Sequence, residues 1–316
     1  MPAPLPLWNR AELAELLALA ARTPTDASPR PASRAVNGGE GRSIFIGRGM
    51  DYAESRLYQP GDDVRAMHWS LLARTGNAHV RLYHEEHTPP WHVLVDLRPA
   101  MAFGTRVRTK MQQAARVAVL AAAIQARHLP QSVLAATLWT AGGWTSHNLG
   151  KGIPAIRRLG SILSREILPD PGSCKPDPVR ARSDFTAIAR RMAMPPHGRI
   201  LTVISDFSWL DPASGTALRG LGAVGQLRAM LIRDPAEIAL PGDVAGNRHA
   251  WFYDETSGQT GMLAGSNPAE AFAAATEAAE AVTGSALREA RAIVAVVTTA
   301  DDALTVWNRT LKVAAA

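Results

Sequence analysis

The chain has 316 residues, of which 47% are hydrophobic and 20% are charged, so it can bury a sizeable core and a wholly disordered chain is excluded. Its longest apolar run, residues 117–124, is far shorter than the roughly 20 residues of a membrane-spanning helix. Asn9, Arg10, Glu12 and Glu15 interrupt the apolar residues among the first seventeen, so this stretch does not resemble a signal peptide. The single cysteine, Cys174, excludes an internal disulfide framework and an all-cysteine zinc site. We therefore expect a cytoplasmic protein without a membrane span.

The first part of the chain is predicted to hold few regular elements. Residues 7–21 have the apolar spacing of an amphipathic helix. Residues 23–34 are rich in Pro, Ser and Arg, which is typical of a linker. Two short predicted strands, 43–47 and 78–86, then flank a dense polar segment.

From residue 91 onward, short apolar strands alternate with helices. This alternation predicts an α/β fold, with a parallel or mixed sheet and helices on both faces. A proline-rich loop at 170–182 precedes a helix for which Ser183 or Asp184 is the predicted N-cap. The predicted elements are, in chain order, strand 92–97, helix 106–127, strand 133–139, edge strand 144–149, helix 153–166, helix 183–194, strand 199–206, helix 216–221, strand 227–232, a hairpin of 249–253 with 261–263, helix 269–289, strand 292–298 and helix 303–313.

The formal charge of +6 is unevenly distributed. Residues 101–165 contain nine basic residues and no acid, whereas residues 251–305 contain eight acids against Arg288 and Arg291. Such asymmetry can steer an acidic partner or order a self-association, and it is equally typical of a solvated helix face. Nucleic acid is disfavoured as a partner because the chain has neither zinc-finger spacing nor a cluster of aromatic residues.

Two of the predicted strands end in a carboxylate. Asp96 ends the first strand of the alternating region, and Asp206 ends the most clearly apolar one. Ligand sites of doubly wound sheets lie at the carboxyl ends of the strands. Two carboxylates meeting there ordinarily call for a hard cation, because an unpaired buried charge is costly.

The polar segment at 47–69 carries the most specific pattern in the chain. It contains the core Arg-x-Tyr-x-Pro-Gly-Asp-Asp-x-Arg, and the pattern continues through the Glu85–Glu86 pair, residues 205–207 and residues 234–237. With these motifs the chain resembles a large bacterial family, the domain-of-unknown-function family 58, from about residue 41 to the end. The signature residues are Arg56, Tyr58, Pro60, Gly61, Asp62, Asp63, Arg65, His68, Trp69 and Arg74.

The resemblance implies a von Willebrand factor A-like domain with the signature region as an N-terminal addition. The implied organisation is a helix and linker at 1–34, a β-rich signature segment at 35–90 and the von Willebrand factor A-like domain at 91–316. The resemblance also implies an association with MoxR-type AAA+ ATPases and, by extension, with other von Willebrand factor A proteins. It implies neither a cofactor nor an enzymatic activity.

The signature residues allow two interpretations. Pro60 and Gly61 favour a turn, after which Asp62 and Asp63 can accept from backbone N–H groups or pair with arginines. Their arginine partners would be Arg56, Arg65 and Arg74, with Tyr58 and Trp69 packed beside them. The segment is then either a docking surface or, as we favour for Asp62, Asp63 and Arg65, a buried network that locks it to the core. His68 stands where the family usually has an acidic or amide residue.

The metal loop that the resemblance implies is degenerate. A von Willebrand-type metal site uses Asp-x-Ser-x-Ser, a Ser or Thr from a second loop and an Asp from a third, whereas this chain has Asp96, Arg98 and Ala100 in the first loop. Ser183 matches the second element and Asp206 the third. We expect no metal here and hypothesise that the Arg98 guanidinium replaces the ion and pairs with Asp96 or Asp206.

The sequence thus favours a non-enzymatic interaction module, an adaptor or co-chaperone for the ATPase. The alternative is a divalent-metal-binding module or metal-dependent hydrolase that uses Asp96 and Asp206. A zinc site in His84-Glu85-Glu86-His87 is disfavoured, because the two histidines are three residues apart on a predicted strand and not four apart on a helix.

Overall fold

The chain divides into two compact units. The computed structural model describes residues 7–8, 10–22, 46–47, 51–84, 88–169, 177–194, 198–239, 249–254, 259–264 and 268–315. The larger unit consists of Met1–Pro29 and Pro89–Ala316, and the smaller one of Arg30–Thr88. The smaller unit is therefore an insertion, along the chain, between the first helix of the larger unit and its first strand. Cys174, the linker at 23–34 and residues 85–87 lie outside the described residues.

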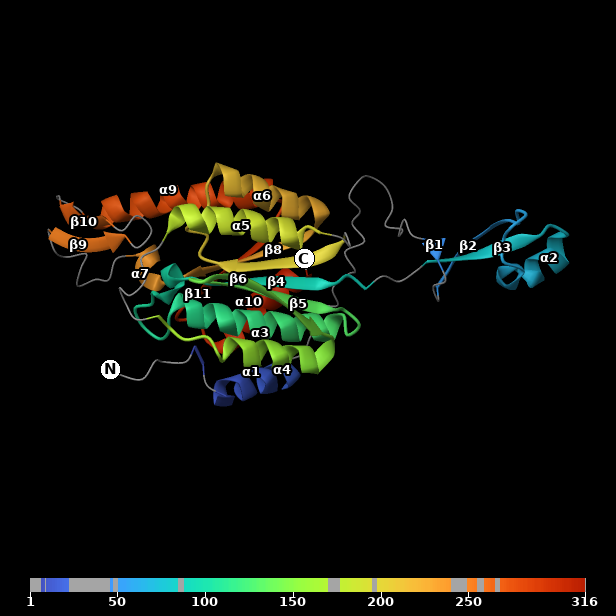
Figure 1. The fold of residues 1–316 in the computed structure, drawn as a ribbon, viewed down its shortest axis with the longest axis horizontal. Coiled ribbons are helices and arrows are strands. Elements are labelled where there is room, and N and C mark those ends of the chain that lie inside the picture. The colour runs from blue at the N-terminus through green and yellow to red at the C-terminus, as the bar shows by residue number, and fades with distance from the viewer. Residues whose placement is uncertain are drawn as a thin grey trace. The chain divides into compact units, whose positions relative to one another are not determined.

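A six-stranded sheet forms the centre of the larger unit, in the order β11-β8-β7-β4-β5-β6 (Figure 1). All its pairings are parallel except that of β6 with β5, which is antiparallel. The order reverses beside β4, whose residues are all buried, as expected for a strand with neighbours on both sides. The strands are β4 (Trp91–Leu97), β5 (Leu134–Thr140), β6 (Gly143–Gly150), β7 (Arg199–Ser205), β8 (Gly225–Arg233) and β11 (Ile293–Thr298).

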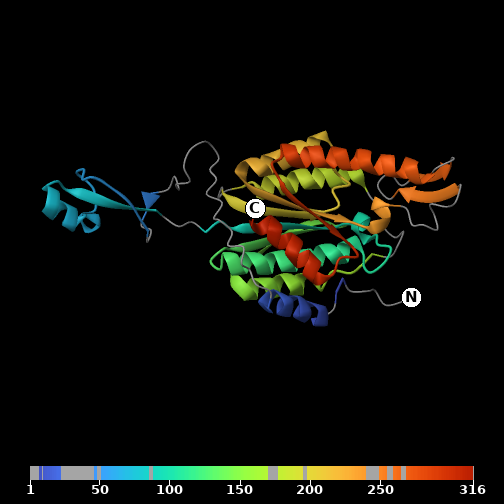
Figure 2. The same cartoon turned by 180° about the vertical axis from the view of Figure 1, so that it is seen from behind.

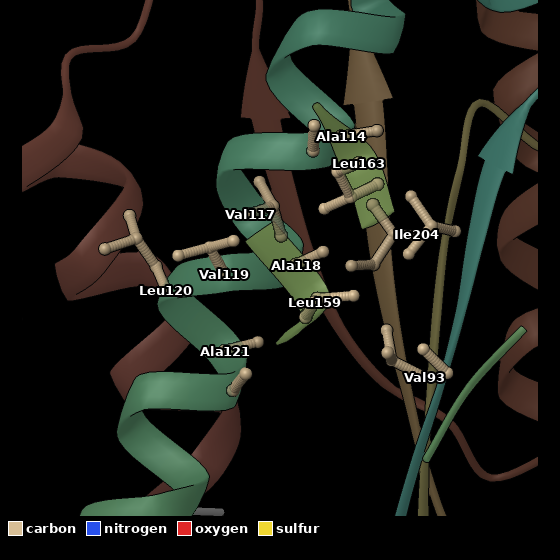
Figure 3. Close-up of a cluster of buried hydrophobic side chains, with 14 of the residues drawn as sticks. Val93, Ala114, Val117, Ala118, Val119, Leu120, Ala121, Leu159, Leu163 and Ile204 are labelled. Carbon is tan, nitrogen blue, oxygen red and sulfur yellow. The ribbon is translucent and has the colours of Figure 1, made fainter. Parts of the chain in front are cut away.

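Helices cover both faces of this sheet, as Figures 1 and 2 show. Successive residues of β4 point to opposite faces, so Val93 and Val95 belong to one core cluster and Leu94 to the other. Figure 3 shows part of the first cluster, in which Leu159 and Ile204 approach the alanine-rich face of α3. The first face is covered by α1 (Arg10–Arg22), α3 (Lys110–His128), α4 (Gly152–Leu163) and α10 (Ala303–Ala315), and the second by α5 (Pro178–Met192), α6 (Pro212–Val224) and α9 (Pro268–Glu289). The predicted α/β class is confirmed.

Short polar side chains fix where several helices begin. The Thr109 side chain accepts from Gln112 N at the start of α3, and Asp211 accepts from Ser214 N at the start of α6. Helix α5 begins at Pro178, because Asp177 accepts from Arg180 N and a proline suits the first helical position. The predicted start at Ser183 or Asp184 is therefore wrong: both residues lie inside the helix.

The remaining elements are short. A two-stranded antiparallel hairpin of β9 (His249–Asp254) and β10 (Gln259–Ala264) precedes α9, as the sequence predicts. A 3-10 turn, η2 (Pro99–Ala102), follows β4, and the short helix α7 (Pro235–Ile238) follows β8. Within the described residues, no helix has the length and apolar character needed to cross a bilayer.

The smaller unit is a three-stranded antiparallel sheet with one helix. Its strands lie in the order β1-β3-β2 and are β1 (Ile46–Gly47), β2 (Asp51–Leu57) and β3 (His79–His84). A 3-10 turn, η1 (Val64–Ala66), and the helix α2 (Trp69–Thr75) lie between β2 and β3 along the chain. The polar signature therefore contains a strand and a helix that its composition does not indicate.

Candidate functional site

Asp96 is held by its own loop at the carboxyl end of β4. Its Oδ1 accepts from the backbone N (3.1 Å) and Nε (2.9 Å) of Arg98, and its Oδ2 accepts from Arg98 Nη2 (2.7 Å) and Ser205 Oγ (2.6 Å). The carboxylate is fully buried, and the Arg98 side chain is only 12% exposed. Burial lowers the pKa of Arg98, but Asp96, Asp206 and Asp184 outweigh it and raise the pKa above its usual value. Arg98 therefore stays a fixed cation.

Asp206, at the end of β7, is paired with a different cation. Lys110 Nζ donates to Asp206 Oδ2 (2.8 Å) and to Glu237 Oε1 (2.6 Å). Lys110 and Asp206 are 5% and 2% exposed, so their charges meet in a nearly dry environment. Burial opposes ionisation of Asp206, but Lys110 and then Arg98 outweigh it and hold its pKa far below the usual range. The same carboxylates raise the pKa of Lys110 against the effect of its burial.

The first turn of α3 explains why Lys110 needs these partners. Lys110 is the first residue of the helix, where the helix dipole disfavours a cation. Asp206, just after β7, and Glu237 of α7 compensate that cost. A further bond, from Arg233 Nη1 to the Asp206 carbonyl oxygen (2.5 Å), fixes the turn after β7. The pairing thus ties α3 to the ends of two strands.

A further carboxylate, that of Asp234, holds the loop between η2 and α3 in place. Asp234 accepts from Thr105 N (3.0 Å), Thr105 Oγ1 (2.5 Å) and Thr299 Oγ1 (2.6 Å), and it also caps α7. The residue is fully buried. This brace holds the loop at 103–109 over the strand ends, where Arg106 and Val107 are exposed.

Aromatic rings form the floor beneath Arg98. Its guanidinium carbon lies 3.9 Å from the centroid of the Trp139 ring, a cation–π contact. Trp139 in turn contacts Phe185 and Trp209, and Trp209 Nε1 donates to Ser205 Oγ (2.9 Å). Phe207 has a left-handed backbone (φ 59°), and its N–H donates to the same Ser205 oxygen (3.0 Å). The floor therefore fixes both the cation and the loop that presents Asp206.

These residues do not fit a divalent cation. Both oxygens of Asp96 are taken by Arg98 and Ser205, and those of Asp206 by Lys110 and by Ser208 N. Mg²⁺ needs oxygen ligands free to coordinate it, and two fixed cations beside those oxygens repel it. Ala100 is buried in η2 and offers no side-chain oxygen. Across the described residues, no group of three or more His, Cys, Asp or Glu could hold a metal.

Only some of the residues that the sequence predicts for this site lie together. Asp96, Arg98 and Asp206 lie together at the strand ends. Ser183 does not join them: it is exposed on α5, and the neighbouring Asp184 faces the site, where Trp139 Nε1 donates to its Oδ2 at 3.4 Å. The assignment of Ser183 is therefore wrong. The difference arises because α5 begins earlier than predicted, which sets which of its residues face the sheet.

A model of a protein family described as "Protein of unknown function DUF58" matches residues 54–282. The chain belongs to this family. Uncharacterized proteins Mb1516 of Mycobacterium bovis and Rv1480 of Mycobacterium tuberculosis are each 30% identical to it over 220 residues, 65% of this chain and 62% of theirs. The chain thus spans less than two thirds of the length of these relatives.

Solved structures with a similar arrangement include von Willebrand factor A proteins. A conserved hypothetical protein, BatB, from Bacteroides thetaiotaomicron has a TM-score of 0.43 at 13% identity, over 72% of this chain and 100% of that one. A von Willebrand factor type A protein from Catenulispora acidiphila has a TM-score of 0.40 at 11% identity, over 75% and 44%. The fold of this DUF58 chain, a mostly parallel sheet with one antiparallel edge strand and helices on both faces, is the arrangement that the resemblance to von Willebrand factor A-like domains implies.

The DUF58 signature builds the turn and the helix of the smaller unit. Arg56 donates two hydrogen bonds to the Asp62 carboxylate (2.8 and 2.6 Å), and Gln59 N donates to the same carboxylate (2.8 Å). Arg56 and Gln59 lower the pKa of Asp62. Pro60 and Gly61 (φ 106°) form the turn between them, and the Tyr58 N–H donates to Ala78 on the approach to β3. The Arg56–Asp62 ion pair therefore stabilises the turn that lies between the two residues.

Other signature residues are on the surface of their unit. Asp63 accepts from Arg65 N (2.9 Å) and caps η1, and both residues are exposed, so a buried network is the wrong interpretation for them. Arg74 and Trp69 are also exposed, Trp69 by 61%. His68 Nδ1 accepts from Leu71 N (3.1 Å) and caps α2, a task that an acidic or amide residue performs equally well.

Sequence reasoning missed Lys110 and Glu237 as members of the site. Lys110 stands in the sequence among the basic residues of 101–165, a region interpreted as a surface. A signal was present: a helix that follows a parallel strand begins near that strand's carboxyl end, where Asp96 and Asp206 were already expected. A lysine in its first turn is unfavourable unless carboxylates lie opposite.

Proposed function

We propose that the chain is a non-enzymatic protein-interaction module that acts as an adaptor or co-chaperone for a MoxR-type AAA+ ATPase, and for other von Willebrand factor A proteins. One observation supports a function without metal chemistry. Each carboxylate at the strand ends is already neutralised by a cation of the chain, Asp96 by Arg98 and Asp206 by Lys110. The choice of an ATPase as partner rests on the family resemblance alone.

The proposed docking surface is the loop at 103–109 above the strand ends. It lies at the edge where doubly wound sheets bind their ligands, and it is anchored on both sides, by Thr105 to Asp234 and by Lys110 to Asp206. Between the anchors it exposes Val107, at 62%, next to Arg106. An exposed apolar side chain on a fixed loop can bind a partner at little entropic cost.

The partner is tested with purified proteins. Binding of the native chain to a MoxR-type ATPase encoded in the same genome is measured by biolayer interferometry in nucleotide-free, ADP and ATP-analogue states. We expect saturable binding in at least one state, and a Val107→Asp variant to bind at least about tenfold more weakly, since a charge in an interface core costs more than 1.4 kcal/mol. Absence of binding in every state would remove the ATPase as partner.

Ile153→Asp is the matched control. Ile153 is 61% exposed and lies in the first turn of α4, just after β6 has run back to the opposite end of the sheet. Its variant should bind as the native chain does. Equal losses in both variants would mean that the 103–109 loop is not the docking surface.

A Mg²⁺ titration tests the metal alternative. We expect no saturable heat at millimolar Mg²⁺ or Mn²⁺ in a calorimeter, because the carboxylate oxygens are engaged. A sub-millimolar affinity that Asp96→Ala abolishes would contradict the proposal, and hydrolysis of a test substrate that depends on Asp206 would replace the adaptor with an enzyme.

A further inference from the structure

Arg228 is a buried cation with no acid opposite it. It lies on β8, in the half of the sheet remote from Asp96, and is 6% exposed. Its contacts are neutral: Nη1 donates to Gln125 Oε1 (3.3 Å), and Nη2 donates to Gln226 Oε1 (2.9 Å) and to the carbonyl of Ala314 (3.0 Å). Among the described residues, none forms an ion pair with it. Burial lowers its pKa to about 10, so the side chain still carries its charge at neutral pH.

Polar atoms without partners gather around this arginine. Arg228 Nε, Gln125 Nε2 and His128 Nε2 are all buried and have no hydrogen-bond partner in the described chain. Gln125 touches Arg228, and His128 lies one turn further along α3. Two of the three groups are obligate N–H donors, and a buried donor left unpaired costs about 1–3 kcal/mol. The cluster therefore calls for an acceptor.

A small cavity adjoins the guanidinium. It has room for one water or an ion of similar size. Most of its wall is apolar, including Trp91, Met230 and Val313, and Arg228 is the charged residue in that wall. A cavity of this size excludes phosphate, sulfate and side-chain carboxylates brought by a partner.

The electrostatic surroundings are positive. Burial and then Arg127 and Arg228 lower the pKa of His128, the last residue of α3. The carboxyl ends of α3 and α10, where Gln125 and Ala314 accept from Arg228, each carry a partial negative charge of roughly −0.5. A neutral water would accept from the unpaired N–H groups but would leave the charge of the Arg228 guanidinium uncompensated. A small anion would accept from these groups and also neutralise that charge.

We propose that Arg228 binds a small monovalent anion, of the size and charge of chloride, in this cavity. The ion would tie β8 to the ends of α3 and α10. It would be a structural ligand of the sheet, independent of the adaptor role and of any metal.

The test measures thermal unfolding of the full chain at constant ionic strength. Sodium gluconate, whose anion is too large for the cavity, is replaced stepwise by sodium chloride. The native chain should gain about 3 °C in Tm at a chloride concentration ten times the Kd, and above the Kd the gain should rise with the logarithm of the chloride concentration. Arg228→Met should lose the dependence, and Arg228→Lys should retain part of it.

Arg158→Met is the matched control, because Arg158 also donates to a backbone carbonyl, that of Leu149, but is exposed. It should keep the native chloride response. If Arg228→Met does not fold, bromide anomalous scattering from crystals of the native chain replaces it, with a peak expected beside the guanidinium. A native Tm that is equal in both salts, a chloride response that persists in Arg228→Met, or the absence of a bromide peak would each overturn the proposal.

Discussion

The two ends of the central sheet handle buried positive charge in opposite ways. At the carboxyl ends of the strands, Arg98 and Lys110 each meet a buried carboxylate within 2.8 Å. In the other half, Arg228 meets only neutral oxygens, and His92 is kept neutral by burial. A paired cation holds its own counter-charge in place, whereas an unpaired one has to find it in solution. On the proposal above, the end with paired cations is closed to outside ions, and the half around Arg228 is open to a small anion.

The largest expected effect is at the paired end. Lys110→Met leaves the charge of Asp206 buried without its partner, which costs about 3–5 kcal/mol in the free energy of unfolding. Urea unfolding of the larger unit measures it. Arg219→Met serves as control, because Arg219 and Glu289 form an exposed pair whose loss costs about 1 kcal/mol or less. A Lys110→Met cost as small as the control's would mean that the paired end is not held by charge.

The next effect is a pH dependence from His92. Its pKa is about 4 in the folded chain, because of burial and then of Arg199 and Arg191, against about 6.5 when unfolded. The unfolded state therefore takes up a proton first as the pH falls, so stability is full above about pH 6.5 and declines toward pH 4. We expect a loss of about 2 kcal/mol between pH 7 and pH 5.

Replacing the imidazole of His92 separates its contribution to the pH dependence of stability from the contributions of other groups. His92→Asn should remove the pH 7 to pH 5 decline, whereas His147→Asn, on the half-exposed edge strand β6, should leave it. The Asp206–Lys110 pair contributes little to the change in stability between pH 7 and pH 5. The depressed pKa of Asp206 places its loss below about pH 4, and the raised pKa of Lys110 places its loss above about pH 10. A decline that survives in His92→Asn would assign it to other groups.

The smallest effect is at Arg228. Arg228→Met removes a charge that has no oppositely charged partner, so the variant leaves no unpaired charge buried and only neutral acceptors lose their hydrogen bonds. We expect the free energy of unfolding, measured in urea, to fall by about 1–2 kcal/mol. The cost should shrink further in gluconate, where the native chain has no ion to lose. A cost equal to that of Lys110→Met in both salts would erase the contrast between the two ends.

The sequence predicts the architecture well and the charge pairs in part: Arg98 pairs with Asp96, one of its two predicted partners, whereas the Lys110 partner of Asp206 was missed. Alternating apolar runs are local signals, so the strand ending in Asp96, the strand ending at Ser205 and the hairpin before α9 were all recognisable. Lys110 and Asp206 are 96 residues apart, and no local pattern joins them. The place of Ser183 failed for a local reason: one cap, Asp177, moves the start of α5. Charge pairs depend on which helix begins over which strand, and that is settled only by packing.

The insertion of the smaller unit has a consequence for fragment experiments. Although Arg30–Thr88 separates α1 from the sheet along the chain, α1 belongs to the larger unit: Glu12 pairs with Arg116 of α3, and Leu7 N donates to Glu166. Leu13 packs so closely on α4 that a methyl group at Gly160 would lie 2.6 Å from it. We therefore expect a chain cut inside the insertion to yield two peptides that stay associated without a covalent link.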